Sequence, residues 1–268
     1  MKITDNKGNE IVVYDNGNIP KGLEIRFEGF NNLLYIDGNT VFENSSFVFR
    51  GNGAIAYIGK NLNVIYVDVT LSHNGTCYMG ENIYINPKGG TPPIIDVFEG
   101  QNVVIGRDCI IGCSTVMMTS DAHLIYDSKT KKRINEAKSI YIGDHVWIGA
   151  RSIILKGGVI GSGSIIGVNS TVCSGTYGSG KVFAGNPAKE RKKDICFLLG
   201  PAAFYESDRL SECELLNSDE GIFKKDHGTL DLEETDSKLK SIYDAKERMQ
   251  YLIDEIASKN DHNRFYIE

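Results

Sequence analysis

Aliphatic side chains recur at every sixth position along much of the chain, and a glycine follows most of them. The step is clear at Ile105, Ile111 and Met117, and a weaker form of it includes Ile58, Val64, Met79 and Ile85. The uninterrupted series consists of Ile142, Ile148, Ile154, Ile160, Ile166 and Val172. This spacing matches neither the helical period of about 3.6 residues nor the two-residue alternation of a half-buried strand.

A six-residue period is typical of a short strand followed by a turn. Three such units complete a triangular coil of about eighteen residues, in which the aliphatic side chain points inward. Stacked coils bury one continuous core, and each coil is supported by its neighbours. We therefore expect an all-β fold, a parallel β-helix over residues 22–192 that follows an N-terminal segment, 1–21. A β-sandwich with accidental spacing is the alternative.

The six-residue step fails between Met117 and Ile142. The intervening loop, residues 118–139, is polar, net basic and too long for a corner turn. Long loops on a rigid scaffold are usually functional or disordered. This loop contains His123, preceded by Asp121, which makes the histidine a candidate for chemistry; a solvated surface histidine is the alternative.

The only tryptophan, Trp147, follows this loop in the sequence VWIG. Because Ile148 takes the inward position and successive strand residues point to opposite faces, the indole should face outward. An exposed indole usually contacts a ligand or another protein. Trp147 is therefore a candidate functional residue, with a subunit-interface aromatic as the alternative.

The C-terminal part differs in charge and in pattern. Residues 1–193 carry 20 basic and 17 acidic side chains, whereas residues 194–268 carry 9 and 18. In this extension, 193–268, apolar side chains at helical spacing predict an amphipathic helix over Asp236–Ser258, capped by Asp236 or Thr235. Because an isolated helix is marginal in water, its apolar face should pack on the β-helix end or on neighbouring subunits.

Composition limits the class of protein and its cellular location. The chain has 268 residues, 24% of them charged and 41% hydrophobic, which is ordinary for a globular protein. No apolar run is long enough to span a membrane, and no secretory signal or paired-cysteine motif is present. We therefore expect a cytoplasmic location with free thiols. The net charge of −6 argues against nucleic acid as a partner.

The repeat resembles the left-handed β-helix of the hexapeptide-repeat acyltransferases, which use acetyl-CoA and commonly form trimers. The similarity covers about residues 55–192. The tracts SDAHLIYD, RINEAKSIYIGDHVWIGA and FAGNPAK are most similar to the polysialic acid and capsular polysaccharide O-acetyltransferases. The resemblance implies transfer of an acetyl group from acetyl-CoA, a co-substrate, to a carbohydrate hydroxyl. A capsular or sialic-acid-containing polysaccharide is one such acceptor.

The resemblance also implies roles for individual residues. In that family a loop histidine and the tryptophan of the VWIG motif are both needed for transfer, and these map onto His123 and Trp147. The amides of the CoA arm should bond to backbone groups at Ala150 and, one coil later, at Val168, where alanine or glycine is usual. Two further residues that match the family, and should meet the CoA phosphates, are Lys181 and Lys189.

Acetyl transfer from a thioester to a hydroxyl needs few catalytic groups. A base must take the acceptor proton as the oxygen attacks, and a donor must stabilise the tetrahedral oxyanion. An ordinary imidazole, with a pKa near ~6.5, suits a base at neutral pH. We expect His123 to deprotonate the hydroxyl directly, without an acyl-enzyme, while Asp121 or a backbone carbonyl fixes its tautomer.

The sequence is also consistent with other functions. Within the enzymes, the alternatives are an N-acetyltransferase acting on an amino sugar, a serine O-acetyltransferase or another small-molecule acyltransferase. Outside them, the alternative is a non-catalytic β-helix scaffold. No metal is expected: the γ-class carbonic anhydrases share this fold but need three histidines on zinc, and His73, His123 and His145 lack the close pair of such a site.

A single β-helix has flat outer faces and no deep cleft. Acyl transfer needs a partly enclosed site, where oriented donors act on the oxyanion away from water. Two β-helices packed side by side make such a groove. We therefore expect a homotrimer in which His123 of one subunit and Trp147 of its neighbour line the same cleft.

Overall fold

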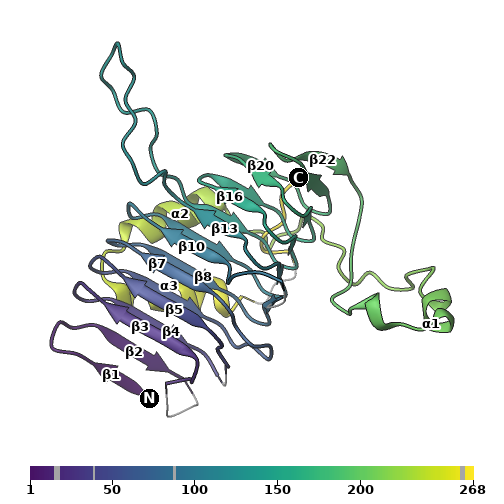
Figure 1. Ribbon diagram of the computed structural model, residues 1–268, viewed down its shortest axis with the longest axis horizontal. Coiled ribbons are helices and arrows are strands. Elements are labelled where there is room, and N and C mark those ends of the chain that lie inside the picture. The colour runs from purple at the N-terminus through teal and green to yellow at the C-terminus, as the bar shows by residue number, and fades with distance from the viewer. Residues whose placement is uncertain (15–18, 39, 87–88, 260–262) are drawn as a thin grey trace.

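The computed structural model describes residues 1–14, 19–38, 40–86, 89–259 and 263–268. In these ranges the chain forms the left-handed parallel β-helix that the repeat and the resemblance predicted. A long arm and a C-terminal extension project from it (Figure 1). The coils contribute strands to three sheets, which form the three faces of a triangular prism; before residue 84 the described strands belong to only two of these sheets.

Face 1 is the nine-stranded sheet, with its strands hydrogen bonded in chain order. Only its first pair is antiparallel, between β1 and β2. Its strands are β1 (Lys2–Thr4), β2 (Glu10–Val13), β4 (Leu33–Ile36), β6 (Ile55–Ile58), β8 (Thr76–Met79), β11 (Asn102–Ile105), β14 (Ile140–Ile142), β17 (Gly158–Ile160) and β20 (Gly175–Tyr177).

Face 2 has seven strands, and face 3 has six. The strands of face 2 are β3 (Leu23–Phe27), β5 (Ser45–Phe49), β7 (Asp68–Leu71), β10 (Ile94–Val97), β13 (Val116–Met118), β16 (Ile153–Leu155) and β19 (Thr171–Val172). Those of face 3 are β9 (Tyr84–Ile85), β12 (Ile110–Ile111), β15 (Trp147–Ile148), β18 (Ile165–Ile166), β21 (Val182–Ala184) and β22 (Lys189–Lys192), the last one antiparallel to β21.

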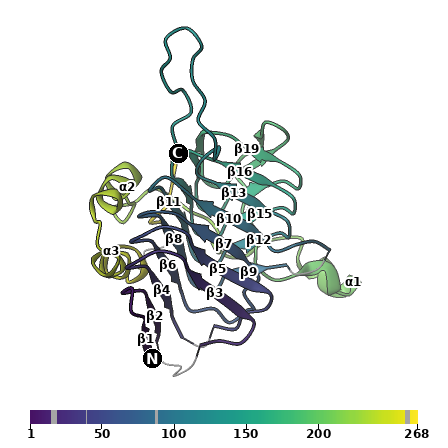
Figure 2. The same ribbon diagram turned by 60° about the vertical axis from the view of Figure 1, so that its left-hand side comes forward.

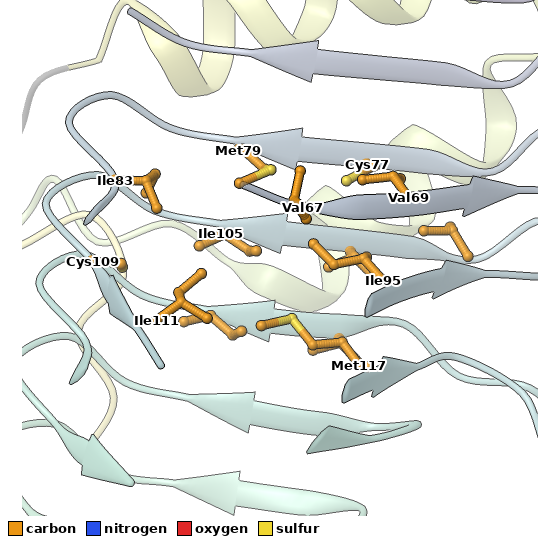
Figure 3. Packing of buried hydrophobic residues seen from close by; sticks show 14 of the residues in the cluster. Val67, Val69, Cys77, Met79, Ile83, Ile95, Ile105, Cys109, Ile111 and Met117 are labelled. Atoms are coloured by element: carbon orange, nitrogen blue, oxygen red, sulfur yellow. The ribbon is translucent and has the colours of Figure 1, made fainter. Parts of the chain in front are cut away.

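The aliphatic series fills the interior of the prism. Ile142 pairs with Ile160 on face 1, and Ile148 pairs with Ile166 on face 3. All six members of the uninterrupted series are at most 1% exposed, which confirms the predicted common core. Figure 3 shows Ile105, Ile111 and Met117 pointing into the same interior from different strands.

The N-terminal coils are longer than the repeat predicts. Leu33 pairs with Ile55, and Ile55 pairs with Thr76, so each coil holds extra residues at its corners. The extra residues shift the inward position: Val64 is 43% exposed, and the buried side chain is Ile65. The prediction for Val64 is therefore wrong. The parallel pairing also begins at β2, within residues 1–21, where no six-residue step is visible.

The C-terminal extension has several short helices instead of one long helix. Asp231 and Asp244 each accept hydrogen bonds from backbone N–H groups of the following turn and so begin separate helices. The prediction of a continuous helix over Asp236–Ser258 is wrong, because the pattern of apolar residues carries no sign of the break before Asp244. The elements are η1 (Ala202–Phe204), α1 (Ser207–Glu212), α2 (Leu232–Ser241), α3 (Ala245–Leu252) and a π-helical turn, η2 (Ile253–Ala257).

Helices α2 and α3 lie against face 1, as Figure 2 shows. A stack of tyrosines on that face, with ring centroids 4.7 Å apart between Tyr35 and Tyr57 and 5.0 Å apart between Tyr57 and Tyr78, forms part of the surface that they cover. Leu239 and Leu252 are buried in the same cluster. Helices α2 and α3 therefore pack on the side of their own prism and not on its end, whereas α1 projects away from the coils (Figure 1). None of the described helices is long and apolar enough to cross a bilayer.

Candidate functional site

The arm leaves the prism at the corner between faces 2 and 1. Strand β13 ends at Met118 and β14 begins at Ile140, so the arm comprises residues 119–139. Its two ends are joined where the N–H of Lys138 donates to the carbonyl of Thr119 at 3.0 Å. Figure 1 shows the arm projecting well beyond the coils.

The buried side chain of Asn135, which is 7% exposed, organises the base of the arm. Its Nδ2 donates to Asp121 Oδ2 at 2.9 Å and to the carbonyl of His123 at 2.7 Å, while its Oδ1 accepts from the N–H of Ile125. Lys156 Nζ donates to Asp121 Oδ2 at 2.5 Å and to the carbonyl of Asn135 at 3.2 Å. This network fixes the backbone on both sides of His123. The Lys156 ammonium is the main cause of the lowered pKa of Asp121.

A second brace joins the arm to the coil below. Ser120 Oγ donates to Glu99 Oε1 at 2.5 Å, and Arg133 forms an ion pair with Glu99 at 2.7 Å. The Ser120 hydrogen bond and then the Arg133 charge lower the pKa of Glu99. The base of the arm is therefore attached to residues of two coils, through Glu99 and Lys156.

The imidazole of His123 is exposed, and no hydrogen-bond partner for it lies within the described parts of the chain. Asp121, which we considered as the group that fixes its tautomer, instead accepts hydrogen bonds from Lys156 and Asn135. Asp121 thus positions the backbone of His123 and leaves both ring nitrogens available to a ligand.

Trp147 lies on β15 of face 3 and is 43% exposed, while the adjacent Ile148 is fully buried. The outward orientation predicted for the indole is therefore confirmed. Trp147 is one of a row of outward-facing residues in register on successive strands of this face. The row is Tyr84, Ile110, Trp147, Ile165 and Val182.

The topology separates the two candidate catalytic residues within one chain. From β7 onward, each coil runs from face 2 to face 1 and then to face 3. The arm, with His123, leaves from the corner between faces 2 and 1, and this corner is opposite the face that carries Trp147. One chain therefore does not place the two side chains at a common cleft.

Three of the four predicted CoA-binding residues lie along the corner between faces 3 and 2. The N–H of Asn169, next to Val168, donates to the carbonyl of Ala150 at 2.9 Å, so these positions are on consecutive coils. Lys189 on β22 is the strand partner of Ala184 on β21, and Ala184 lies one coil beyond Val168 along this corner. Val168 is 67% exposed, which keeps the corner accessible.

Lys181 is at the opposite edge of face 3, just before β21, and pairs with Glu190 at 3.3 Å. It is therefore separated by the width of the sheet from the corner formed by Ala150, Val168 and Lys189. The resemblance grouped Lys181 with Lys189 by sequence alone, which does not show at which corner each side chain lies.

The described residues contain no group of three or more His, Cys, Asp or Glu side chains placed to hold a metal ion. The thiols in the core are also poor nucleophiles. Burial raises the pKa of Cys77 to about 12 and that of Cys109 further. The chemistry available to the described site is thus that of an exposed imidazole, an exposed indole and a corner of backbone amides.

No family model matches the chain. Among solved structures, the polysialic-acid-specific acetyltransferase NeuO is 30% identical, with a TM-score of 0.66 over 84% of this chain and 94% of that one. The putative lipopolysaccharide biosynthesis O-acetyl transferase WbbJ of Escherichia coli K12 is 30% identical over 54% of this chain and 74% of its own length. The polysialic acid O-acetyltransferase of Neisseria meningitidis is 26% identical over 48% and 68%.

Proposed function

Because this chain belongs to the left-handed β-helix O-acetyltransferases, we propose that it transfers the acetyl group of acetyl-CoA to a hydroxyl of a cell-surface polysaccharide. The observation that carries the proposal is the match with NeuO, which extends over 94% of that chain at 30% identity. The names of the relatives favour polysialic acid as the first acceptor to test, followed by a lipopolysaccharide glycan.

In the proposed reaction His123 is the general base. Its ring nitrogen takes the proton of the acceptor hydroxyl as the oxygen attacks the thioester carbonyl carbon. The new C–O bond forms, the C–S bond breaks, and the imidazolium returns the proton to the departing CoA sulfur. The hydrogen-bond network of Asn135 supports this role, because it fixes the backbone of His123 and leaves the ring unpaired.

Acetyl-CoA lies along the corner of Ala150, Val168 and Lys189 in this proposal. Consecutive coils approach closely at this corner, since the backbone of Ala150 lies against Gly112 and that of Val168 against Gly149, closely enough to exclude any side chain on either glycine. Exposed Lys189 supplies a cation for the phosphates. Lys181, at the other edge of face 3, would reach the phosphates only from across the sheet.

We further propose that the protein is a homotrimer with each cleft between two subunits. The arm supports this arrangement because its apolar side chains have no cover in a single chain: Tyr126 is 52% exposed and Leu124 is 59% exposed. Burying them on a neighbour would bring His123 towards face 3 of that neighbour, where Trp147 is exposed. The helices already cover face 1, so faces 2 and 3 are left for subunit contacts.

The function is tested by release of CoA from acetyl-CoA, followed with a thiol reagent in the presence of an acceptor panel. The panel contains polysialic acid, a lipopolysaccharide O-glycan, a galactoside, glucosamine and serine. We expect release with a saccharide hydroxyl, an ester product that hydroxylamine cleaves, and loss of both in the His123→Ala variant. Reaction only at the amine of glucosamine indicates an N-acetyltransferase, and no release with any acceptor indicates a scaffold.

A further inference from the structure

Residues 193–199, here called the strap, follow β22 and cross the corner between faces 1 and 3. The N–H of Ile195 donates to the carbonyl of Gly180 at 3.0 Å. Further along, His145 Nε2 lies 2.7 Å from the carbonyl of Phe197 and must donate, since a carbonyl oxygen only accepts. The strap is therefore fixed by hydrogen bonds of its backbone on two coils.

The side chain of Phe197 makes two contacts of different kinds. One face of its ring stacks on the imidazole of His145, with centroids 4.1 Å apart and planes 21° apart. The ring also lies beside Trp147, with centroids 6.0 Å apart and planes tilted by 51°. Because Phe197 is half-buried and Trp147 is 43% exposed, the two rings form an open apolar corner on face 3.

Trp147 lies between this ring and the proposed CoA corner. Strand β15 consists of Trp147 and Ile148 only, and the chain reaches Ala150 at the edge of face 3 next to face 2. Phe197 packs at the other edge, next to face 1, through His145. An acceptor must approach the thioester from a side that CoA does not occupy. The space beside Trp147 that is bounded by Phe197 lies on such a side.

We propose that Phe197 forms a wall of the acceptor subsite and contacts the apolar C–H face of a sugar ring bound beside Trp147. This inference rests on the proposed function. Aromatic side chains give large apolar contacts at low cost in conformational freedom. Two tilted rings offer such a contact to a flat, partly apolar ring while its hydroxyls stay free for polar groups. Phe197 is thus a specificity-determining residue supplied by the C-terminal extension, outside the hexapeptide repeat.

The test uses kinetics of the full-length protein with polysialic acid as the probe. In the Phe197→Leu variant the strap keeps its hydrogen bond to His145, since that bond uses the backbone carbonyl. We expect the KM for polysialic acid to rise about tenfold, while the KM for acetyl-CoA stays within about twofold. The control is Phe223→Leu, which removes another ring packed near His145, at 6.0 Å, and should keep both KM values.

Trp147 fluorescence provides a second readout that does not require turnover, because this is the only tryptophan. We expect polysialic acid to change the emission of the wild-type protein without acetyl-CoA, and the midpoint of that change to shift about tenfold in Phe197→Leu. Transfer to polysialic acid with unchanged acceptor KM and midpoint in Phe197→Leu overturns this inference and leaves the proposed function standing. Absence of transfer to every saccharide in the panel overturns the proposed function, and this inference with it.

Discussion

At the scale of single residues, His123 is the group whose loss should affect chemistry most. We expect His123→Ala to lower kcat by about 10²–10⁴ while the affinity for acetyl-CoA stays nearly unchanged, as for loss of a general base. Steady-state kinetics with the best acceptor of the panel measure this. The matched control is His227→Ala, which removes another exposed histidine, from the extension. Near-normal turnover of His123→Ala would show that another group is the base.

The ion pair between Arg264 and Asp144 connects the end of the chain to the coil that carries Trp147. Both side chains are 2% exposed, and Arg264 Nε and Nη2 each donate to a carboxylate oxygen at 2.9 Å. Burial disfavours the charge of Arg264, but the carboxylate of Asp144 outweighs that effect and raises the pKa of Arg264. Removing one partner would leave the other charge buried and unpaired.

We therefore expect Arg264→Met to lower the free energy of unfolding by about 3–5 kcal/mol. Urea denaturation followed by circular dichroism measures the change. Lys259→Met is the control, because its partner Glu255 is on the surface and such pairs contribute at most about 1 kcal/mol. Equal effects of the two substitutions would contradict the structural role of the buried pair.

The sequence identified some of these residues and missed others for a physical reason. Trp147 stood out because it is the only tryptophan and takes an outward position where the repeat resumes, and His123 because it lies where the pattern stops. Lys156 and Arg264 act through partners on other coils, and Asn135 through partners ten or more residues away in the arm. Their spacing therefore carries no signal, and only the folded chain brings their polar groups together.

At the scale of the elements, the six-residue step predicted the C-terminal coils well. Its aliphatic positions from Ile142 to Val172 are buried because the coils there have the same length, so one position always points inward. The N-terminal coils hold extra corner residues, which move the inward position from Val64 to Ile65. The break between α2 and α3 was also missed, because the apolar stripe continues through both helices.

Helix α3 should stabilise the protein through its contact with face 1. Leu252 is fully buried in the cluster that contains the tyrosine stack. We expect Leu252→Ala to cost about 2–5 kcal/mol of unfolding free energy, from lost burial and the cavity left behind. The control, Leu215→Ala, changes a side chain that is 77% exposed and should shift stability by less than about 0.5 kcal/mol. A similar midpoint in urea for both variants would mean that α3 is only loosely attached.

Glu10 links the first coil to α3 and gives this attachment a pH dependence. It pairs with Lys2 at 3.0 Å and with Lys246 at 2.9 Å, and its side chain is 6% exposed. Burial tends to raise the pKa of Glu10, but the two ammonium groups outweigh burial and lower it. A carboxyl with a lowered folded pKa stabilises fully above its unfolded pKa, and this contribution is lost as the pH falls through the folded value.

We therefore expect the wild-type protein to lose more stability than Glu10→Gln when the pH falls below about 4.5. The neutral amide of Gln cannot titrate, so the Glu10→Gln variant lacks the stabilisation by the carboxylate at every pH. Thermal unfolding midpoints at a series of pH values measure the difference between the two proteins. Parallel profiles across the acidic range would mean that Glu10 has the same pKa in the folded and unfolded states.

At the scale of the whole molecule, the separation of His123 and Trp147 predicts complementation between subunits. After dissociation and reassembly of inactive His123→Ala and Trp147→Ala proteins in equal amounts, about one quarter of the clefts in random trimers carry neither substitution. Activity should recover to about that fraction of wild type. Each variant reassembled alone is the control, and mass-tagged subunits report exchange. Background activity after demonstrated exchange would place both residues in one chain.

The joined ends of the arm have a consequence for how such enzymes diverge. Thr119 and Lys138 are held together by a hydrogen bond, so the arm begins and ends at nearly the same point of the stack. Insertions, deletions or exchanges between these residues leave the pairing of every coil unchanged, and loop length affects closure entropy only weakly. The outer part of the arm, between His123 and Asn135, can therefore change without disturbing the coils. Such a change would alter the surface that the arm offers to a glycan, while the coils beneath it keep the same donor.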